Sequence, residues 1–384
     1  MSYLDHNATT PLCCEAREVM LPWFEQLSGN PSGIHALARR ARAAIDEARD
    51  RIAALLGAKP HEIIFTAGGT ESCNLAILGL ARRHRTERRR HLVTATTEHH
   101  AVLHAMRALA EREEFELTEV PVDPQGLIDP SIFAAALRPE TLLASVMVAN
   151  NETGVIQPIA ELSALCREQG IFFHSDAVQA FGKIPVVPLD LGIDALSATA
   201  HKFHGPHGAG FLWARSGVSI DPIQHGGFHE NERRPGTENV AAIAAMAVAA
   251  GVAVAEALEG VEAARQASLR DRLWEGILHA DPSAIRNSAG APVLANTLNV
   301  SFPGCDGETL LMGLDLEGVS ASSGSACMVG SIRSSHVLEA MGIPPEIAGA
   351  TVRFSLGRET TDGEIEAAIV AVQRVLARQS RRHG

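Results

Sequence analysis

Short apolar runs alternate with amphipathic stretches through the first half of this 384-residue chain, and few folds accommodate such a pattern. The apolar runs have the length of strands and fall at 63–66, 92–95, 115–122, 142–149, 171–174 and 195–199. Helical periodicity separates most of them, at 71–84, 101–112 and 159–169. Strands that alternate with helices form a parallel sheet covered on both faces. Such a sheet binds ligands at the carboxyl ends of its strands, where polar loops fall here.

A second α/β pattern follows nearer the C-terminus. An Ala-rich stretch to about residue 258 and another stretch to about residue 278 predict two long helices. Strand and helix patterns then alternate again, at 297–302, 308–316, 319–321, 335–341, 351–356 and 362–377. Because the chain is long enough for two domains, we predict a smaller α/β domain at the C-terminus.

Lysine is scarce in this chain, and its scarcity narrows the search for a reactive amine. Only three of the 33 basic residues are lysines: Lys59, Lys183 and Lys202. Arginine stays protonated and supplies no free amine to an aldehyde cofactor such as pyridoxal phosphate (PLP). Lys202 alone has neighbouring hydroxyl, imidazole and glycine groups suited to hold a phosphate and a ring. The alternative is a surface lysine in a hairpin loop.

A carboxylate, Asp176, ends another buried strand. In a PLP enzyme an aspartate there pairs with the protonated pyridine nitrogen and makes the ring an electron sink. Gln179 follows about one helical turn later, on the same side, and suits the phenolic oxygen of the ring. The alternative for Asp176 is a helix N-cap.

Three other polar segments also end strands. Gly69 and Thr70 lie in a strand–turn–helix segment whose exposed N–H groups suit a phosphate. His99 is placed to stack on a cofactor ring and exchange protons, because histidine titrates near neutrality. Asn151 suits the ring oxygen. The alternatives are a capped glycine turn, a helix-capping histidine and a turn-forming asparagine.

One thiol, Cys327, stands in a run of small residues from Ser322 to Ser331. Small residues predict a loop that moves, and an exposed thiol that ionises is a nucleophile. Arg353, on a predicted strand, suits a bidentate pair with a substrate carboxylate. The alternatives are a chance cysteine in a Ser/Gly loop and a surface salt bridge.

Composition bears on partners and compartment. A net charge of −12 argues against binding to nucleic acid or to an anionic membrane. The N-terminus lacks the order of a signal peptide, and the uncharged run 240–255 is interpreted as a buried helix. Six cysteines form no C-x-x-C pair, so we expect free thiols, no metal site and a cytoplasmic protein.

Together these motifs resemble the cysteine desulfurases of the NifS/IscS type, which are class-V aminotransferase-like members of the fold-type-I PLP enzymes. The resemblance runs nearly end to end and is specific because so many motifs occur jointly. It rests on Tyr3-Leu-Asp-His-Asn-Ala-Thr-Thr-Pro, Asn30-Pro-Ser, Gly68-Gly-Thr-Glu, Thr97-Glu-His, Asn150-Asn-Glu-Thr-Gly, Ser175-Asp-Ala-Val-Gln, Ala200-His-Lys, Arg234-Pro-Gly-Thr-Glu-Asn, Ser322-Ser-Gly-Ser-Ala-Cys and Arg353-Phe-Ser-Leu-Gly.

The resemblance implies a large PLP-binding domain, with a mainly parallel seven-stranded sheet between helices, and a smaller α/β domain that carries the cysteine loop. We predict that residues 15–258 form the first, and residues 1–14 and 259–384 the second. It also implies a homodimer, the substrate L-cysteine and a sulfur-acceptor protein. The implied roles are Lys202 as Schiff-base lysine, His99 as stacking acid/base, Asp176 at the pyridine nitrogen, Gln179 and Asn151 at the ring oxygen, Gly69, Thr70, Thr199 and His201 at the phosphate, Thr237 at the phosphate of the other subunit, Cys327 as sulfur acceptor, and Arg353 with Asn151 at the substrate carboxylate.

The implied reaction transfers sulfur from L-cysteine to Cys327, which leaves a persulfide on the protein and releases alanine. The alternatives are a selenocysteine lyase, another class-V PLP aminotransferase or an inactive scaffold that binds a sulfur acceptor. Acceptors in iron–sulfur cluster assembly and in tRNA or cofactor thiolation all suit this enzyme type. The chain departs from the family pattern at Thr199, which replaces a serine but keeps the hydroxyl, and at His207, Met328 and Ser334.

Overall fold

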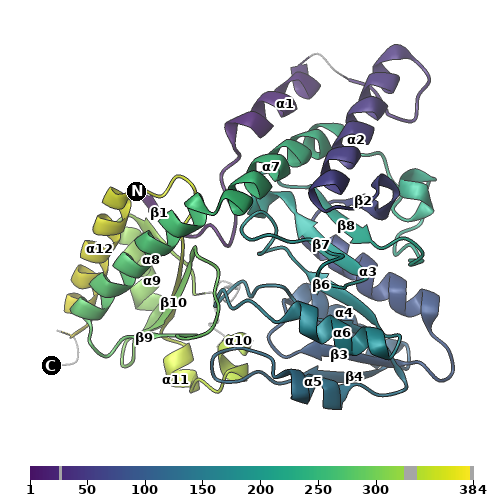
Figure 1. The fold of residues 1–384 in the computed structure, drawn as a ribbon. Helices are drawn as coiled ribbons and strands as arrows, with labels where there is room; N and C mark the ends of the chain where they lie inside the picture. Colours follow the sequence, from purple (N-terminus) through teal and green to yellow (C-terminus); the bar gives the residue numbers. More distant parts are fainter. Residues whose placement is uncertain (26–27, 324–334, 381–384) are drawn as a thin grey trace.

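The computed structural model describes residues 1–25, 28–323 and 335–380 (Figure 1). Its largest sheet has seven strands in the order β2-β8-β7-β6-β5-β3-β4. Only β8 runs antiparallel to its neighbours, so the predicted mainly parallel seven-stranded sheet is confirmed. The strands are β2 (Ile63–Thr66), β3 (His91–Ala95), β4 (Glu116–Val120), β5 (Thr141–Ser145), β6 (Phe172–Asp176), β7 (Ala195–Thr199) and β8 (Gly210–Ala214).

Helices cover both faces of this sheet, because successive side chains of a strand point to opposite sides. In β2, Ile63 and Phe65 pack in one core with residues of α2, α5, α6 and α7. Ile64 packs in the opposite core with residues of α3 and α4. The helices are α1 (Cys14–Glu25), α2 (Ala36–Leu55), α3 (Gly69–His84), α4 (His100–Arg112), α5 (Pro130–Ala136), α6 (Ile159–Glu168) and α7 (Val240–Glu259).

The long helix α7 is a core element. By length and composition it is the one helix among the described residues that is apolar enough to cross a membrane. However, 61% of its most apolar window is buried inside the protein, where α7 packs against α1 and α2. Burial against other helices accounts for its composition, as expected from the sequence.

A separate core lies at the C-terminal side and includes the N-terminal residue Leu4. It is built on an antiparallel sheet in the order β12-β10-β9 and on a short parallel pair, β1 with β11. The first residues of the chain therefore pack with the last hundred or so (Figure 1). The elements are β1 (Ser2–Tyr3), α8 (Val261–Ala280), β9 (Ile285–Arg286), β10 (Thr297–Ser301), α9 (Gly307–Leu316), β11 (Val319–Ser320), β12 (Thr351–Ser355) and α12 (Asp362–Ser380).

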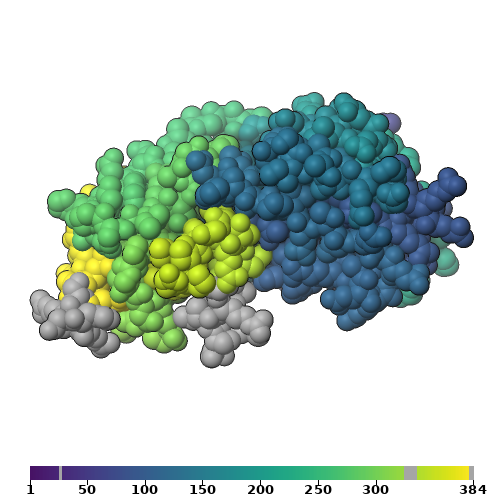
Figure 2. Space-filling model, turned by 90° about the horizontal axis from the view of Figure 1, so that it is seen from below, coloured from purple at the N-terminus to yellow at the C-terminus, as the bar shows by residue number. Residues whose placement is uncertain are grey.

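Two short helices, α10 (His336–Ala340) and α11 (Pro345–Ala348), lie between the C-terminal part and the large sheet (Figure 2). Val337, Leu338, Met341 and Ala348 form a small cluster that packs on Val122, which follows β4. Three single turns of 3-10 helix complete the described elements: η1 (Pro60–Glu62), η2 (Ala200–Lys202) and η3 (His229–Glu232). The predicted domain boundaries at residues 14 and 258 stay a prediction.

Candidate active site

A cavity of about 420 Å³ opens at the carboxyl ends of β6 and β7. Residues from both sheets line it, together with Asn7 and Ala8 from the N-terminal segment. Thr237 does not line it, and Cys327 lies outside the described residues, as do Met328 and Ser334. Ten of the predicted site residues line it: Gly69, Thr70, His99, Asn151, Asp176, Gln179, Thr199, His201, Lys202 and Arg353.

Lys202 ends the turn η2, directly after β7. Its Nζ donates to the backbone carbonyls of Asn7, at 2.5 Å, and Ala8, at 2.7 Å. Burial, and to a lesser degree the positive charge of Arg353, lower the pKa of Lys202 to about 8, while Asp5 and Asp176 oppose the shift. The amine is therefore closer to deprotonation at neutral pH than an ordinary lysine.

Asp176, the last residue of β6, is a buried carboxylate. It accepts hydrogen bonds from the backbone N–H of Val178 at 2.8 Å and from the thiol of Cys73 at 3.5 Å. Burial raises the pKa of Asp176, and the nearby His99 and Lys202 lower it. Within the described ranges Asp176 makes no ion pair, and it lines the cavity.

The first turn of α3 forms one wall. Gly69 begins this helix, and a Cβ there would meet Val178 Cγ2 at 2.7 Å, so only glycine fits without displacing that residue. The first N–H groups of a helix have no intrahelical partner and suit an anion. Thr70 lies on this turn, and the hydroxyl of Thr199 lies across from Gly68, with 3.5 Å between its Oγ1 and a Cβ built on Gly68.

His201 completes this wall. It contacts His207, one of the residues at which the chain departs from the family pattern. The two imidazole rings stack with their centroids 5.0 Å apart. The Thr9 hydroxyl bridges them, at 3.2 Å from His201 Nδ1 and 3.0 Å from His207 Nε2. Burial, with the charges of Lys202 and His207, lowers the pKa of His201 to about 4. His201 is thus a neutral ring at physiological pH.

His99 has two positions at once: it lines the cavity and caps α4. Its Nδ1 accepts from the backbone N–H of Ala101 at 3.1 Å, as the helix-cap alternative required. That bond leaves Nε2 for other contacts and fixes the ring at the cavity. Burial lowers the pKa of His99, although Asp176 opposes the shift.

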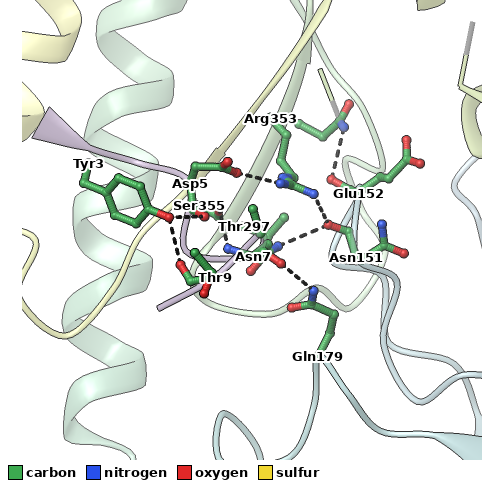
Figure 3. Close-up of polar contacts among 12 residues, drawn as sticks. Tyr3, Asp5, Asn7, Thr9, Asn151, Glu152, Gln179, Thr297, Arg353 and Ser355 are labelled. Atoms are coloured by element: carbon green, nitrogen blue, oxygen red, sulfur yellow. Dashed lines mark hydrogen bonds and ion pairs between the residues drawn. The ribbon is translucent and has the colours of Figure 1, made fainter. Parts of the chain in front are cut away.

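Arg353 forms the opposite wall, from strand β12 (Figure 3). Its Nη2 pairs with Asp5 Oδ1 at 2.6 Å, and its Nη1 donates to the carbonyl of Asn151 at 2.9 Å. The side chain is only 4% exposed, and its Nε has no partner among the described residues. A buried donor without a hydrogen bond lowers the stability of the protein unless a ligand accepts a hydrogen bond from it. A carboxylate is a good acceptor for such a bond.

Asn7 was not predicted from the sequence, yet it is the centre of the polar network (Figure 3). Its side-chain Nδ2 donates to Thr297 Oγ1 at 2.9 Å and to Asn151 O at 3.3 Å. Its carbonyl accepts from Gln179 Nε2 at 2.9 Å and from Lys202. In the sequence Asn7 stands only within the motif Tyr3-Leu-Asp-His-Asn-Ala-Thr-Thr-Pro, which names no partner for it.

The described residues on either side of the segment that contains Cys327 are fixed at the cavity. Ser322 and His336 line it. His336 Nε2 donates to the carbonyl of Glu98 at 3.0 Å, and the Ser335 hydroxyl donates to Glu152 at 2.5 Å. Burial raises the pKa of both Glu98 and Glu152, and Glu152 lines the cavity.

These residues fit PLP. The cavity offers a lysine amine of lowered pKa, a buried carboxylate without an ion pair among the described residues, and a helix start suited to a phosphate. Arg353 adds a buried N–H that has no partner in the described part of the chain, and a carboxylate suits it. The lysine, the carboxylate and the helix start face one space, which is what a ring with a phosphate arm requires.

Comparison with known proteins gives a consistent result. The profile of the family "Aminotransferase class-V" matches residues 2–368. A cysteine desulfurase IscS of Dictyoglomus turgidum is 46% identical over 374 residues, which cover 97% of this chain and 94% of that protein. A solved structure described as a NifS-like protein superposes with a TM-score of 0.91 at 35% identity, covering 98% of this chain and 100% of its own. The structure of SspA in complex with cysteine superposes with a TM-score of 0.81 at 35% identity, covering 93% and 99%.

Proposed function

We propose roles for individual residues on the premise that this chain belongs to the aminotransferase class-V family, in which it is a PLP-dependent cysteine desulfurase. Its substrate is L-cysteine, and the sulfur that it removes passes to a sulfur acceptor. One observation carries the assignment of roles: Lys202, Asp176 and Arg353, whose buried Nε has no partner among the described residues, all line the same cavity.

When bound, PLP supplies an electron sink for the electrons released at the substrate's Cα. Asp176 holds the proton on the ring nitrogen, because a buried carboxylate stabilises a neighbouring cation. Gln179 and Asn151 would bind the ring oxygen, and His99 would stack on the ring and exchange protons. Gly69, Thr70, Thr199 and His201 would hold the phosphate at the start of α3.

Lys202 would hold the cofactor through its aldehyde, and as a free amine it would take the proton from the substrate Cα. A lysine of pKa about 8 is neutral in about a quarter of molecules at pH 7.5, against about one in a thousand for an ordinary lysine. The lowered pKa therefore supplies a base at neutral pH.

Arg353 binds the substrate carboxylate through Nε and one Nη, which requires that Asp5 or Asn151 give up or share a bond. Because Asp5 already compensates the guanidinium charge, the buried arginine is stable before substrate arrives. Asn151 assists at the same carboxylate. The fixed position of the carboxylate then sets the orientation of the cysteine side chain.

Cys327 accepts the sulfur. Its thiolate attacks the substrate's sulfur atom, the Cβ–S bond breaks, and the electrons return to the carbon skeleton, which is protonated and leaves as L-alanine. The net reaction converts L-cysteine and the Cys327 thiol into L-alanine and a Cys327 persulfide. Since Ser322 lines the cavity and precedes Cys327 by five residues, the chain allows at most about 17 Å between their Cα atoms.

The assembly we propose is a homodimer in the cytoplasm. Thr237 is exposed and outside its own chain's cavity, which suits a contact with the phosphate in the other subunit. Ser32 Oγ lies 3.2 Å from His229 Nε2, so two segments adjoin that carry the exposed side chains Ile34 (90%) and Phe228 (85%). Apolar side chains with such high exposure favour burial against a second copy of the chain. Iron–sulfur cluster assembly and tRNA or cofactor thiolation are the proposed destinations of the sulfur.

Cys327→Ser tests the proposed function. The variant should bind PLP normally, because no cofactor contact changes, but it should lose the persulfide and nearly all alanine release from L-cysteine. A serine hydroxyl is far less acidic than a thiol and a poor nucleophile toward sulfur. Cys14→Ser is the matched control. Cys14 is exposed and far from Cys327 in the sequence, so this variant should leave turnover unchanged. Persulfide on another cysteine, with normal turnover in Cys327→Ser, would refute the proposal.

A further inference from the structure

A second lysine, Lys183, lies directly behind the cavity wall. It does not line the large cavity; with Lys202 and Asn296 it borders a small one of about 50 Å³. Burial lowers the pKa of Lys183 well below its usual value, and Lys202 and Arg353 lower it further. The charge of Lys183 also acts on the basic residues His6 and His204, and Glu256, Glu262 and Arg358 line the same small cavity. Among the described residues Lys183 makes no ion pair, so no carboxylate explains why this chain keeps a lysine here.

The amine of Lys183 is held by two amide oxygens. Its Nζ donates to Asn7 Oδ1 and to Gln179 Oε1, each at 2.9 Å. The N–H groups of a lysine are donors, so the oxygen end of each amide must face it. The nitrogen ends then point away: Gln179 Nε2 donates to the carbonyl of Asn7, at the cavity. Without Lys183 the oxygen of the Gln179 amide would lose its donor, and only the bond from Nε2 to the Asn7 carbonyl would still favour this orientation.

The same contact fixes the peptide on which Lys202 rests. The carbonyl of Asn7 accepts from both Lys202 and Gln179, while its side-chain oxygen accepts from Lys183 and from Asn296 Nδ2 at 3.0 Å. Both polar atoms of the Asn7 side chain are therefore used, and among the described residues Lys183 is the one amine that bonds to this side chain. Loss of that partner would loosen one residue that two cavity groups share.

We propose that Lys183 is a positioning residue that keeps the N–H end of the Gln179 amide toward the cofactor and holds the Asn7 peptide in place. The inference rests on the proposed binding of PLP with Gln179 at its ring oxygen. Lys183 itself touches neither cofactor nor substrate. Its part is to make Gln179 a hydrogen-bond donor rather than an acceptor at the ring oxygen.

Lys183→Met tests this, because methionine has similar length and no donor. The protein is loaded with PLP, and the visible absorption of the bound cofactor is titrated between about pH 6 and pH 10. A donor to the ring oxygen favours its ionised form, so loss of that donor should raise the midpoint by about one pKa unit. Lys59→Met, at an exposed lysine outside the site, is the matched control and should give no shift.

The same substitution made in a Gln179→Ala variant separates the role of Lys183 from the role of Gln179 on which it rests. Gln179→Ala alone should raise the midpoint, and Lys183→Met added to it should then raise it much less than Lys183→Met does in the wild type, because Lys183 reaches the ring oxygen through Gln179 and only its contact with Asn7 remains. No shift in Gln179→Ala would overturn the assigned role of Gln179, not that of Lys183. A shift in Gln179→Ala without one in Lys183→Met, or an equal further shift in the double variant, would overturn the inference itself.

Should Lys183→Met fail to fold, Lys183→Gln takes its place. A glutamine presents either end of its amide to Gln179, so it orders that residue only in part, and a smaller upward shift is expected. An unchanged midpoint in Lys183→Gln together with a shifted midpoint in Gln179→Ala would again overturn the inference.

Discussion

The two walls of the cavity are built in different ways. On the cofactor side, Asp176 and Lys202 follow adjacent parallel strands, whose register pairs Asp176 with Ser197. On the substrate side, Asp5 and Arg353 are 348 residues apart and meet only because the N-terminal segment packs with the C-terminal core. A sheet's hydrogen bonds fix the first geometry, whereas a few side-chain contacts fix the second. The two walls should therefore respond differently to substitution.

Lys202→Ala should have the largest effect and act on the cofactor side alone. Loss of a catalytic base lowers turnover by about 10³-fold or more, and covalent attachment of PLP should disappear. The fold should persist, because Lys202 packs little apolar surface into a core. Alanine release from L-cysteine measures turnover, and mass spectrometry after borohydride reduction measures attachment.

Lys59→Ala is the control for this prediction and should keep both properties. A borohydride label that persists in Lys202→Ala on another lysine, with measurable turnover, would contradict the assignment. Lys183 is the informative place to look for it, because its amine also has a lowered pKa.

The same contrast explains what the sequence predicted. Asp176 and Lys202 were predicted because strand periodicity places both at the carboxyl edge of one sheet. The role of Asn7 was not predicted. Its contacts with Gln179, Lys183 and Thr297 exist only once two separate cores pack together. Sequence spacing carries information on neighbouring strands, but not on side chains that meet across 170 to 290 residues.

Arg353→Lys should have an intermediate effect, confined to the substrate side. Lysine keeps the charge but loses the planar fork, so at least one hydrogen bond to the substrate carboxylate is lost. We expect KM for L-cysteine to rise about 10- to 100-fold, while the absorption of bound PLP stays unchanged. Steady-state kinetics and a spectrum of each protein measure the two quantities.

The control is Arg215→Lys, an arginine paired with Asp194 beside the opposite ends of the sheet strands. It should change neither KM nor the spectrum. If Arg353→Lys instead weakened PLP binding as strongly as cysteine binding, the two walls would not be separable in the way that their construction indicates.

Asp5→Asn should have the smallest effect and is the sharpest test, because Asp5 acts on both walls. It pairs with Arg353 on the substrate side, and its charge raises the pKa of Lys202 on the cofactor side. Lys202 works as a base only when neutral, so kcat should rise as pH rises through about 8. Asparagine removes the negative charge that stabilises the Lys202 ammonium, so the pKa of Lys202 falls and the acid limb of kcat moves to lower pH, by about half a unit. If Asp5 only held Arg353 in place, KM would rise and the acid limb would stay where it was. A pH profile of kcat beside one of kcat/KM therefore decides whether the substrate wall also tunes the base on the opposite wall.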